Sequence, residues 1–132
     1  MECKIDRLEG SELDVDEVLA VYRDSGLGER RPIEDRERFT AMLRNANLVL
    51  CARVSERLVG IARCISDFSY ATYLSDLAVS RDYQRGGIGR ALIAAVQEQA
   101  PAAKVILLSA PGAVEYYPHI GFTQHPSAWT LS

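Results

Sequence analysis

Three glycines stand close together in one short segment of the chain, beside several arginines. The segment runs from Gln84 to Arg90 and carries glycines at positions 86, 87 and 89, with a further arginine at position 81. Glycine has no Cβ, so the backbone N–H groups of such a turn can close on a ligand. The apolar-periodic segment Ile88–Gln99 begins here and predicts a helix, whose N-terminal N–H groups favour an anion. The residues therefore predict a cradle for a phosphate or pyrophosphate.

Two familiar phosphate-binding patterns do not fit this turn. No Lys-Ser or Lys-Thr pair follows the glycines, which excludes a P-loop. Leu92 stands where a dinucleotide-binding fingerprint has its third glycine, and the turn is not the first strand–helix connection of the chain. A glycine-rich connection with surface arginines is the plain structural alternative.

The remaining chain predicts the elements that position this turn. Apolar spacing predicts four helices, at 15–25, 34–45, 88–99 and 113–120, the first with Asp14 as N-cap and Gly26 as its end. Apolar runs predict strands at 48–54, 58–65, 73–79 and 105–109, and a final short strand at 127–131 in which Trp129 packs. This order of elements predicts a mixed sheet covered by helices.

The chain resembles the GNAT acetyltransferase superfamily at three places. The run Gln84-Arg-Gly-Gly-Ile-Gly89 looks like that family's Gln/Arg-x-x-Gly-x-Gly/Ala motif, and Asp76-Leu-Ala-Val79 before it looks like its fourth strand. The run Tyr116-Tyr-Pro-His-Ile-Gly-Phe122 is similar to the family's aromatic-Tyr-x-x-x-Gly-Phe signature. The resemblance covers essentially the whole chain, although the N-terminal third matches only in helix order. It implies an α/β (α+β) fold of the acyl-CoA N-acyltransferase type, with a mixed, mostly antiparallel central sheet flanked by helices.

The resemblance also implies an activity: transfer of an acetyl group from acetyl-CoA to the primary amine of a small-molecule or peptide acceptor, by direct attack on the thioester. Tyr117 matches the tyrosine that serves as general acid in many family members, and a phenol suits this task because its pKa is close to that of a thiol. The backbone of the fourth strand would pair with the pantetheine arm, and the glycine turn would hold the pyrophosphate. The implied cofactor-binding residues are Leu77, Ala78, Val79, Gln84, Arg85, Gly86, Gly87, Ile88, Gly89, Arg90, Ser109 and Tyr117. A non-catalytic acyl-CoA-binding sensor or partner domain is the alternative.

The general base has two candidates. Asp76 lies at a position where family members often carry an acid, and strand alternation places its side chain with Leu74 and Ala78. In a semi-buried setting a raised pKa would suit it to accept a proton. A structural role as partner of Arg63 on the neighbouring strand is an equal alternative. Asp67 is the second candidate, with a solvated loop acid as its alternative.

Two features depart from the family pattern. Ser109 stands near the place where family members often have an asparagine that contacts the pantetheine arm. Only ten residues follow Phe122, so we expect the usual closing hairpin to be cut down. The acceptor cleft is then either open or completed by a second copy in a homodimer.

Length and composition bound the class of protein. The chain has 132 residues, which predicts a single domain over residues 1–132, and no apolar run long enough to span a membrane. A net charge of -3 argues against nucleic acid as a partner. Three scattered cysteines give neither a disulfide framework nor a metal site, and the N-terminal residues lack a secretory signal pattern, so we expect a reduced, cytoplasmic protein.

Charge is unevenly distributed along the chain. Residues 1–37 carry 12 acidic and 6 basic residues, whereas residues 38–132 carry 6 acidic and 9 basic residues. The acids of the first two predicted helices favour a cationic acceptor, because the family builds its acceptor site near those helices. Ordinary solvated helix faces are the alternative.

Overall fold

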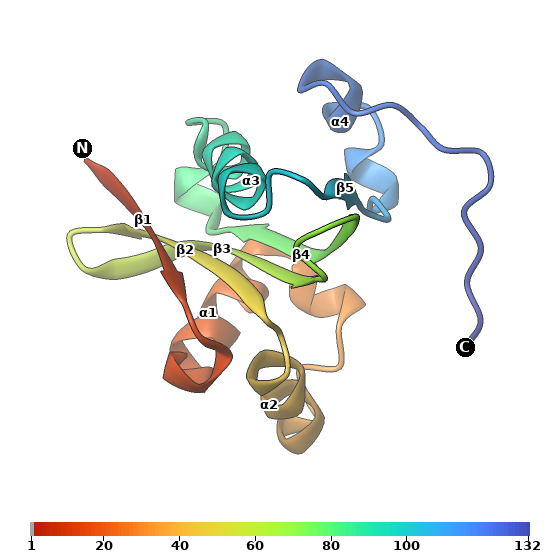
Figure 1. Cartoon of the computed structure of the whole chain (residues 1–132). Coiled ribbons are helices and arrows are strands. Elements are labelled where there is room, and N and C mark those ends of the chain that lie inside the picture. The colour runs from red at the N-terminus through yellow and green to blue at the C-terminus, as the bar shows by residue number, and fades with distance from the viewer. Residues whose placement is uncertain (1) are drawn as a thin grey trace.

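The computed structural model describes residues 2–132 and contains a five-stranded sheet with the strand order β1-β2-β3-β4-β5 (Figure 1). The strands are β1 Cys3–Leu8, β2 Leu48–Val54, β3 Arg57–Ser66, β4 Ala71–Val79 and β5 Lys104–Ile106. The first four pair antiparallel with their neighbours, and β5 alone pairs parallel, with β4. The predicted mixed, mostly antiparallel sheet is therefore confirmed.

Helices cover both faces of this sheet. The helices α1 (Val15–Ser25) and α2 (Arg36–Arg44) lie on one face and α3 (Ile88–Gln99) lies on the other (Figure 1). Each face has its own buried apolar cluster, one around α1 and α2 and one around α3. Short helical segments complete the fold: η1 Gly10–Glu12, η2 Leu27–Arg30, η3 Arg81–Tyr83, η4 Pro111–Ala113 and α4 Tyr116–His119.

Local sequence determines where the first two helices begin. The side chain of Asp14 accepts hydrogen bonds from the backbone N–H groups of Asp16 and Glu17, and Gly26 ends α1 with a φ of 91°. The side chain of Asp35 caps α2 in the same way, from the backbone N–H of Arg38. The predicted cap and end of α1 are confirmed, and α2 is shorter at its start than predicted.

A bulge in β4 changes which side chains share a face. Arg63 pairs with Asp76, but the next residue of β3, Cys64, pairs with Leu74, so Ser75 has no opposite residue. Leu74 consequently packs in the cluster around α3, while Ala78 packs in the cluster around α1. Simple alternation predicted that Asp76 would share a face with both, and for Leu74 that prediction is wrong.

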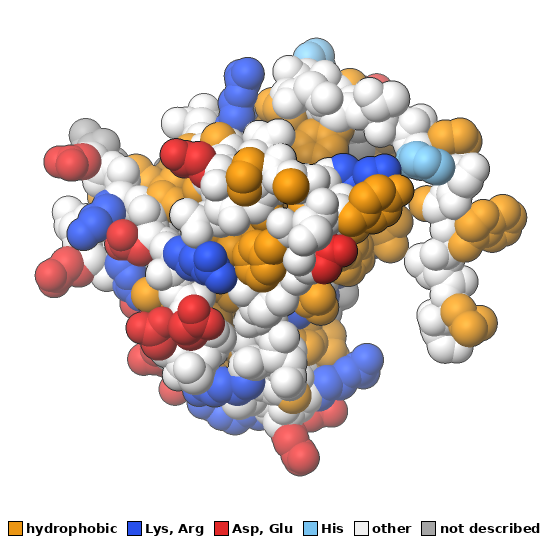
Figure 2. Space-filling model, in the orientation of Figure 1, with side chains coloured by type: hydrophobic (Ala, Val, Ile, Leu, Met, Phe, Trp, Pro, Cys, Tyr) orange, Lys and Arg blue, Asp and Glu red, His pale blue; other side chains and the backbone are white. Residues whose placement is uncertain are grey.

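The two ends of the chain differ most from expectation. The sequence analysis did not predict β1, an edge strand in which no residue is buried. The predicted final strand at 127–131 is wrong, since this segment forms no strand and Trp129 is 91% exposed. Ile120 and Phe122 still pack against the cluster around α3, and the residues that follow run apart from the helices and strands, with Ser132 lining the cleft described below (Figures 1 and 2). A strand needs a neighbour to supply its ladder hydrogen bonds, and this segment has none.

Among residues 2–132, no helix is both long and apolar enough to cross a bilayer. Cys51 and Cys64 are buried within β2 and β3. Burial raises the pKa of each thiol to about 12. Neither thiol is available as a nucleophile at neutral pH.

Candidate active site

A cleft of about 900 Å³ opens where β4 and β5 separate. The two strands pair only between Ala71–Tyr73 and Lys104–Ile106, whereas β4 continues to Val79. The end of β4 therefore presents a free backbone edge to the segment that follows β5. Six of the predicted cofactor-binding residues line this cleft: Leu77, Ala78, Val79, Gln84, Ser109 and Tyr117.

The glycine turn has the backbone geometry of an anion cradle. Arg85 and Gly87 have left-handed conformations, with φ of 67° and 89°, and Gly87 is the N-cap of α3. No side chain caps that helix, so its first N–H groups are free to face a ligand. A Cβ built at Gly87 meets no atom within 4 Å. The turn thus offers open space in front of unpaired donors, which fits a pyrophosphate.

Gln84 joins the turn to the cleft. Its side-chain amide donates a 2.8 Å hydrogen bond to the carbonyl oxygen of Val79, at the end of β4. The side chain therefore fixes the turn against the strand. The other predicted turn residues follow directly after Gln84 and do not line the cleft themselves: Arg85, Gly86, Gly87, Ile88, Gly89 and Arg90.

Tyr117 lies at the cleft wall, where it is half-buried. Its ring makes edge contacts with Tyr116 and Phe122, at centroid distances of 5.3 and 5.4 Å. Burial, followed by the neighbouring Tyr116, raises the pKa of the Tyr117 phenol above its ordinary value. The phenol is therefore protonated at neutral pH and able to donate.

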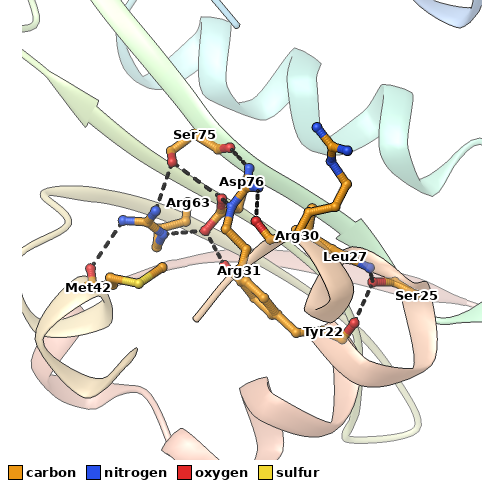
Figure 3. A network of polar contacts seen from close by, with 9 residues as sticks. All are labelled: Tyr22, Ser25, Leu27, Arg30, Arg31, Met42, Arg63, Ser75 and Asp76. Atoms are coloured by element: carbon orange, nitrogen blue, oxygen red, sulfur yellow. Dashed lines mark hydrogen bonds and ion pairs between the residues drawn. The ribbon is translucent and has the colours of Figure 1, made fainter. Parts of the chain in front are cut away.

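A buried network of polar side chains surrounds Asp76 (Figure 3). Three residues of this network, Arg31, Arg63 and Ser75, also line the cleft. Asp76 is 1% exposed and accepts hydrogen bonds from the hydroxyl of Tyr22 at 2.6 Å and from Nε of Arg63 at 2.5 Å. Nε of Arg31 donates to the other carboxylate oxygen at 2.5 Å, and so does the Ser75 hydroxyl at 3.3 Å. One carboxylate thus holds two guanidinium groups and a phenol in place.

The expected raised pKa of Asp76 is wrong. Burial alone would raise the pKa of this carboxyl, but the hydrogen bond and charge of Arg63, the Tyr22 hydrogen bond and the charge of Arg31 together hold it below its ordinary value. Burial, followed by the charge and the hydrogen bond of Asp76, raises the pKa of the Tyr22 phenol, and Arg63 opposes this shift. A carboxylate stabilised in this way is a poor proton acceptor, and the geometry matches the alternative in which Asp76 is the partner of Arg63.

Asp67, the second candidate base, organises its own loop. Its carboxylate accepts hydrogen bonds from the backbone N–H groups of Ser69, Tyr70 and Ala71 at 2.7 to 3.1 Å. These backbone hydrogen bonds lower the pKa of Asp67. The side chain is exposed and does not line the cleft, which matches the reading of a loop acid.

The structure adds functional candidates that the sequence analysis missed. Arg30, Arg31 and Arg38 line the cleft together with Arg63. The first two lie in and just after η2, between α1 and α2. The signal in the sequence was the Arg30-Arg31 pair, which stands out in an otherwise acidic segment.

The acids of the first two helices lie elsewhere. No Asp or Glu side chain within residues 2–132 lines the cleft. Asp14 and Asp35 are helix caps, while the others that have ion-pair partners hold arginines outside the cleft: Asp16 with Arg36, Glu17 with Arg53 and Glu34 with Arg23. The acids therefore give no support to the cationic acceptor that charge distribution suggested.

Comparison with known proteins identifies the family. The profile described as "Acetyltransferase (GNAT) domain" matches residues 18–129. The chain is 32% identical over 72 residues to the uncharacterized N-acetyltransferase ycf52 of Gracilaria tenuistipitata var. liui, which is 52% of this chain and 40% of that protein. It spans about half the length of the other curated relatives that it matches.

Solved structures share the fold over nearly the whole chain. A GNAT family acetyltransferase from Streptococcus pneumoniae TIGR4 superposes with a TM-score of 0.77 and 22% identity, covering 98% of both chains. The PaiA N-acetyltransferase from Thermoplasma acidophilum, solved in complex with coenzyme A, superposes with a TM-score of 0.74 and 19% identity, over 97% of this chain and 94% of that one. The splayed sheet, the glycine turn and these comparisons lead to one conclusion: the chain belongs to the GNAT family of acetyltransferases.

Proposed function

We propose that residues 1–132 form a single N-acetyltransferase domain that moves an acetyl group from acetyl-CoA to a primary amine. The observation that carries this proposal is the continuity between two features. A free strand edge at Leu77–Val79 lines the cleft, and Gln84 ties that edge to an uncapped helix N-terminus with open space in front of it. A ligand with an extended amide-bearing arm and a pyrophosphate matches both features.

Acetyl-CoA, when bound, supplies an activated acetyl thioester, and this chain's residues hold and orient it. The backbone of Leu77–Val79 pairs with the pantetheine arm, and Ser109 faces the same cleft from the segment after β5. The N–H groups at the start of α3 hold the pyrophosphate, with Arg85 and Arg90 adjacent in the turn. A backbone N–H near Val79 polarises the acetyl carbonyl.

Tyr117 is proposed as the general acid. Its phenol lies in the cleft wall with no hydrogen-bond partner among residues 2–132, and its raised pKa keeps the proton on the oxygen at neutral pH. The phenol therefore donates to the departing sulfur. Transfer is proposed to be direct, without an acetylated cysteine, because neither Cys51 nor Cys64 lines the cleft.

Asp76 is proposed as a positioning residue rather than the base. Its carboxylate holds Arg31 and Arg63 at the cleft by hydrogen bonds, but Asp76 itself does not line the cleft. No Asp, Glu or His side chain of residues 2–132 lines the cleft, so the acceptor amine gives up its proton to water. The same observation favours a second candidate function, an acyl-CoA-binding domain without turnover.

Calorimetric titration with acetyl-CoA, ATP and inorganic phosphate tests the proposal. We expect selective binding of acetyl-CoA, followed by thiol release when a primary amine is added. Binding of acetyl-CoA without thiol release for any amine would assign the sensor function. Equal binding of ATP and acetyl-CoA would remove the acyl-CoA site altogether.

A further inference from the structure

The end of the cleft opposite the glycine turn is strongly basic. Arg30, Arg31, Arg38 and Arg63 line the cleft, and Arg31 and Arg63 lie at this end, beside Ser75. Arg31 contacts the carbonyl of Ser75 at 2.8 Å, which places this cluster beside the bulge of β4. From Ser75 to Val79 the strand rises roughly 13 Å at about 3.3 Å per residue. The position at which Arg31 and Arg63 are held therefore lies well away from the end of β4, where Gln84 joins the glycine turn.

The positive charge of this cluster is only partly compensated. Among residues 2–132, Asp76 is the one side-chain carboxylate ion-paired with these arginines, and it is shared between Arg31 and Arg63. Arg30 and Arg38 have no ion-pair partner among residues 2–132. Four guanidinium groups and one side-chain carboxylate leave a net side-chain charge of three positive units along the cleft wall.

Three arginines that do not line the cleft form ion pairs with carboxylates. Arg36, two residues before Arg38 on α2, pairs with Asp16 at 2.7 Å. Arg53 pairs with Glu17 at 2.8 Å, and Arg23 with Glu34 at 3.8 Å. None of these three lines the cleft. These three arginines thus have carboxylate partners, whereas Arg30 and Arg38 in the cleft lining have none among residues 2–132.

The two arginines nearest to Asp76 are held rigidly with donors to spare. Arg63 uses its other nitrogens on the Ser75 hydroxyl and the Met42 carbonyl, and Arg31 uses its own on the Ser75 and Arg30 carbonyls (Figure 3). A guanidinium has five N–H groups, so each of the two keeps N–H groups that the protein does not use. Fixed guanidinium forks match the oxygens of a carboxylate or phosphate.

Building on the proposed function, we propose that the acetyl acceptor is a primary amine that also carries an oxyanion, either a carboxylate or a phosphate. The arginine cluster of Arg30, Arg31, Arg38 and Arg63 binds that oxyanion and leaves the amine directed along the cleft toward the free edge of β4. A polycationic acceptor is disfavoured, because it would bring like charges together in a partly enclosed site.

Matched amines test this inference by their kcat/KM for thiol release from acetyl-CoA. The pairs are β-alanine against β-alaninamide and O-phosphoethanolamine against ethanolamine, with spermidine as the polycation. Hydrogen bonds to charged groups predict at least about a tenfold preference for the anionic member of a pair. The pair with the larger preference tells whether carboxylate or phosphate is the natural group. Equal values within both pairs, or a preference for spermidine, would overturn the inference.

The substitution Arg38→Gln tests whether the arginine cluster causes the preference for anionic amines. We expect it to raise KM for the preferred anionic amine by about tenfold, with no change for its neutral counterpart and no change in acetyl-CoA affinity. Arg36→Gln is the matched control, since Arg36 lies on the same helix outside the cleft. An equal loss in both variants, or a loss of acetyl-CoA affinity in Arg38→Gln, would contradict the assignment.

The same amines separate this inference from the proposed function. If acetyl-CoA binds but no amine is acetylated, the proposed transfer is wrong. Calorimetric titration of β-alanine and O-phosphoethanolamine into the protein loaded with coenzyme A then decides the oxyanion site. Binding that Arg38→Gln abolishes would support the site, and absence of binding would remove it.

Discussion

The two ends of the cleft are built from different parts of the protein. The proposed cofactor end consists of backbone groups from one stretch of chain, the end of β4 and the segment Gln84–Arg90 that leads into the first turn of α3. The acceptor end consists of side chains from α1, η2, α2, β3 and β4. A site made of backbone tolerates change in most side chains, whereas a site made of side chains depends on each partner.

In the proposed function, the backbone of the glycine turn binds the pyrophosphate of the donor. The arginine cluster, in which Asp76 holds Arg31 and Arg63, binds the acceptor. The comparison predicts that the two ends respond differently to substitution.

The largest effect is expected from Asp76→Asn, which leaves Arg31 and Arg63 without their shared carboxylate. Removing one partner of a buried ion pair costs about 3–5 kcal/mol, so we expect a loss of this order in the free energy of unfolding, measured with urea. Asp16→Asn, which breaks the exposed pair with Arg36, is the control and should cost at most about 1 kcal/mol.

The stability difference between wild type and Asp76→Asn depends on pH. The pKa of Asp76 is lower in the folded protein than in the unfolded chain, so its contribution is complete above the unfolded value of about 4 and is lost as pH falls below it. The stability difference between wild type and Asp76→Asn should therefore shrink below about pH 4. A constant difference down to pH 2 would contradict the ion-pair account.

A smaller effect, on turnover, is expected from the substitution Tyr117→Phe in the wall of the cleft. Loss of a general acid lowers kcat by about 100-fold or more, while acetyl-CoA affinity measured by calorimetry stays the same. Tyr116→Phe keeps the paired rings and is the control. Because the pKa of Tyr117 is raised, wild-type kcat should not fall as pH rises to about 9. Equal turnover in Tyr117→Phe and wild type would remove the phenol from the mechanism.

The smallest effect is expected at the backbone-built end, from Gly87→Val. The new side chain enters the open space in front of α3 and strains a residue whose φ is 89°. Losing one charge-assisted hydrogen bond costs about 1.5–3 kcal/mol, so acetyl-CoA affinity should fall roughly 10- to 150-fold.

Gly121→Val is the matched control for this strain, with a φ of 99° and open space around it, outside the cleft. We expect it to lower the thermal midpoint without weakening acetyl-CoA. If a folded Gly87→Val protein bound acetyl-CoA like wild type, the cradle would lie elsewhere.

Elements with local causes were predictable from the sequence. The helix α3 occupies the predicted range Ile88–Gln99, and the predicted end of α1 at Gly26 is confirmed. Both depend on apolar spacing and on one residue at the boundary. The edge strand β1 was not predictable, because its side chains are exposed and its pattern carries little signal.

The sequence by itself determined the glycine turn and the strand–helix unit around it, because neighbouring residues specify a backbone conformation. Only the tertiary structure decided what the acceptor end contains. Asp76 meets Tyr22, Arg31 and Arg63 across separations of 54, 45 and 13 residues. A bulge at Ser75 also turned Asp76 and Leu74 to opposite faces. Contacts across such separations depend on how α1, η2 and the sheet pack together, and the local conformational preferences of the residues do not specify that packing.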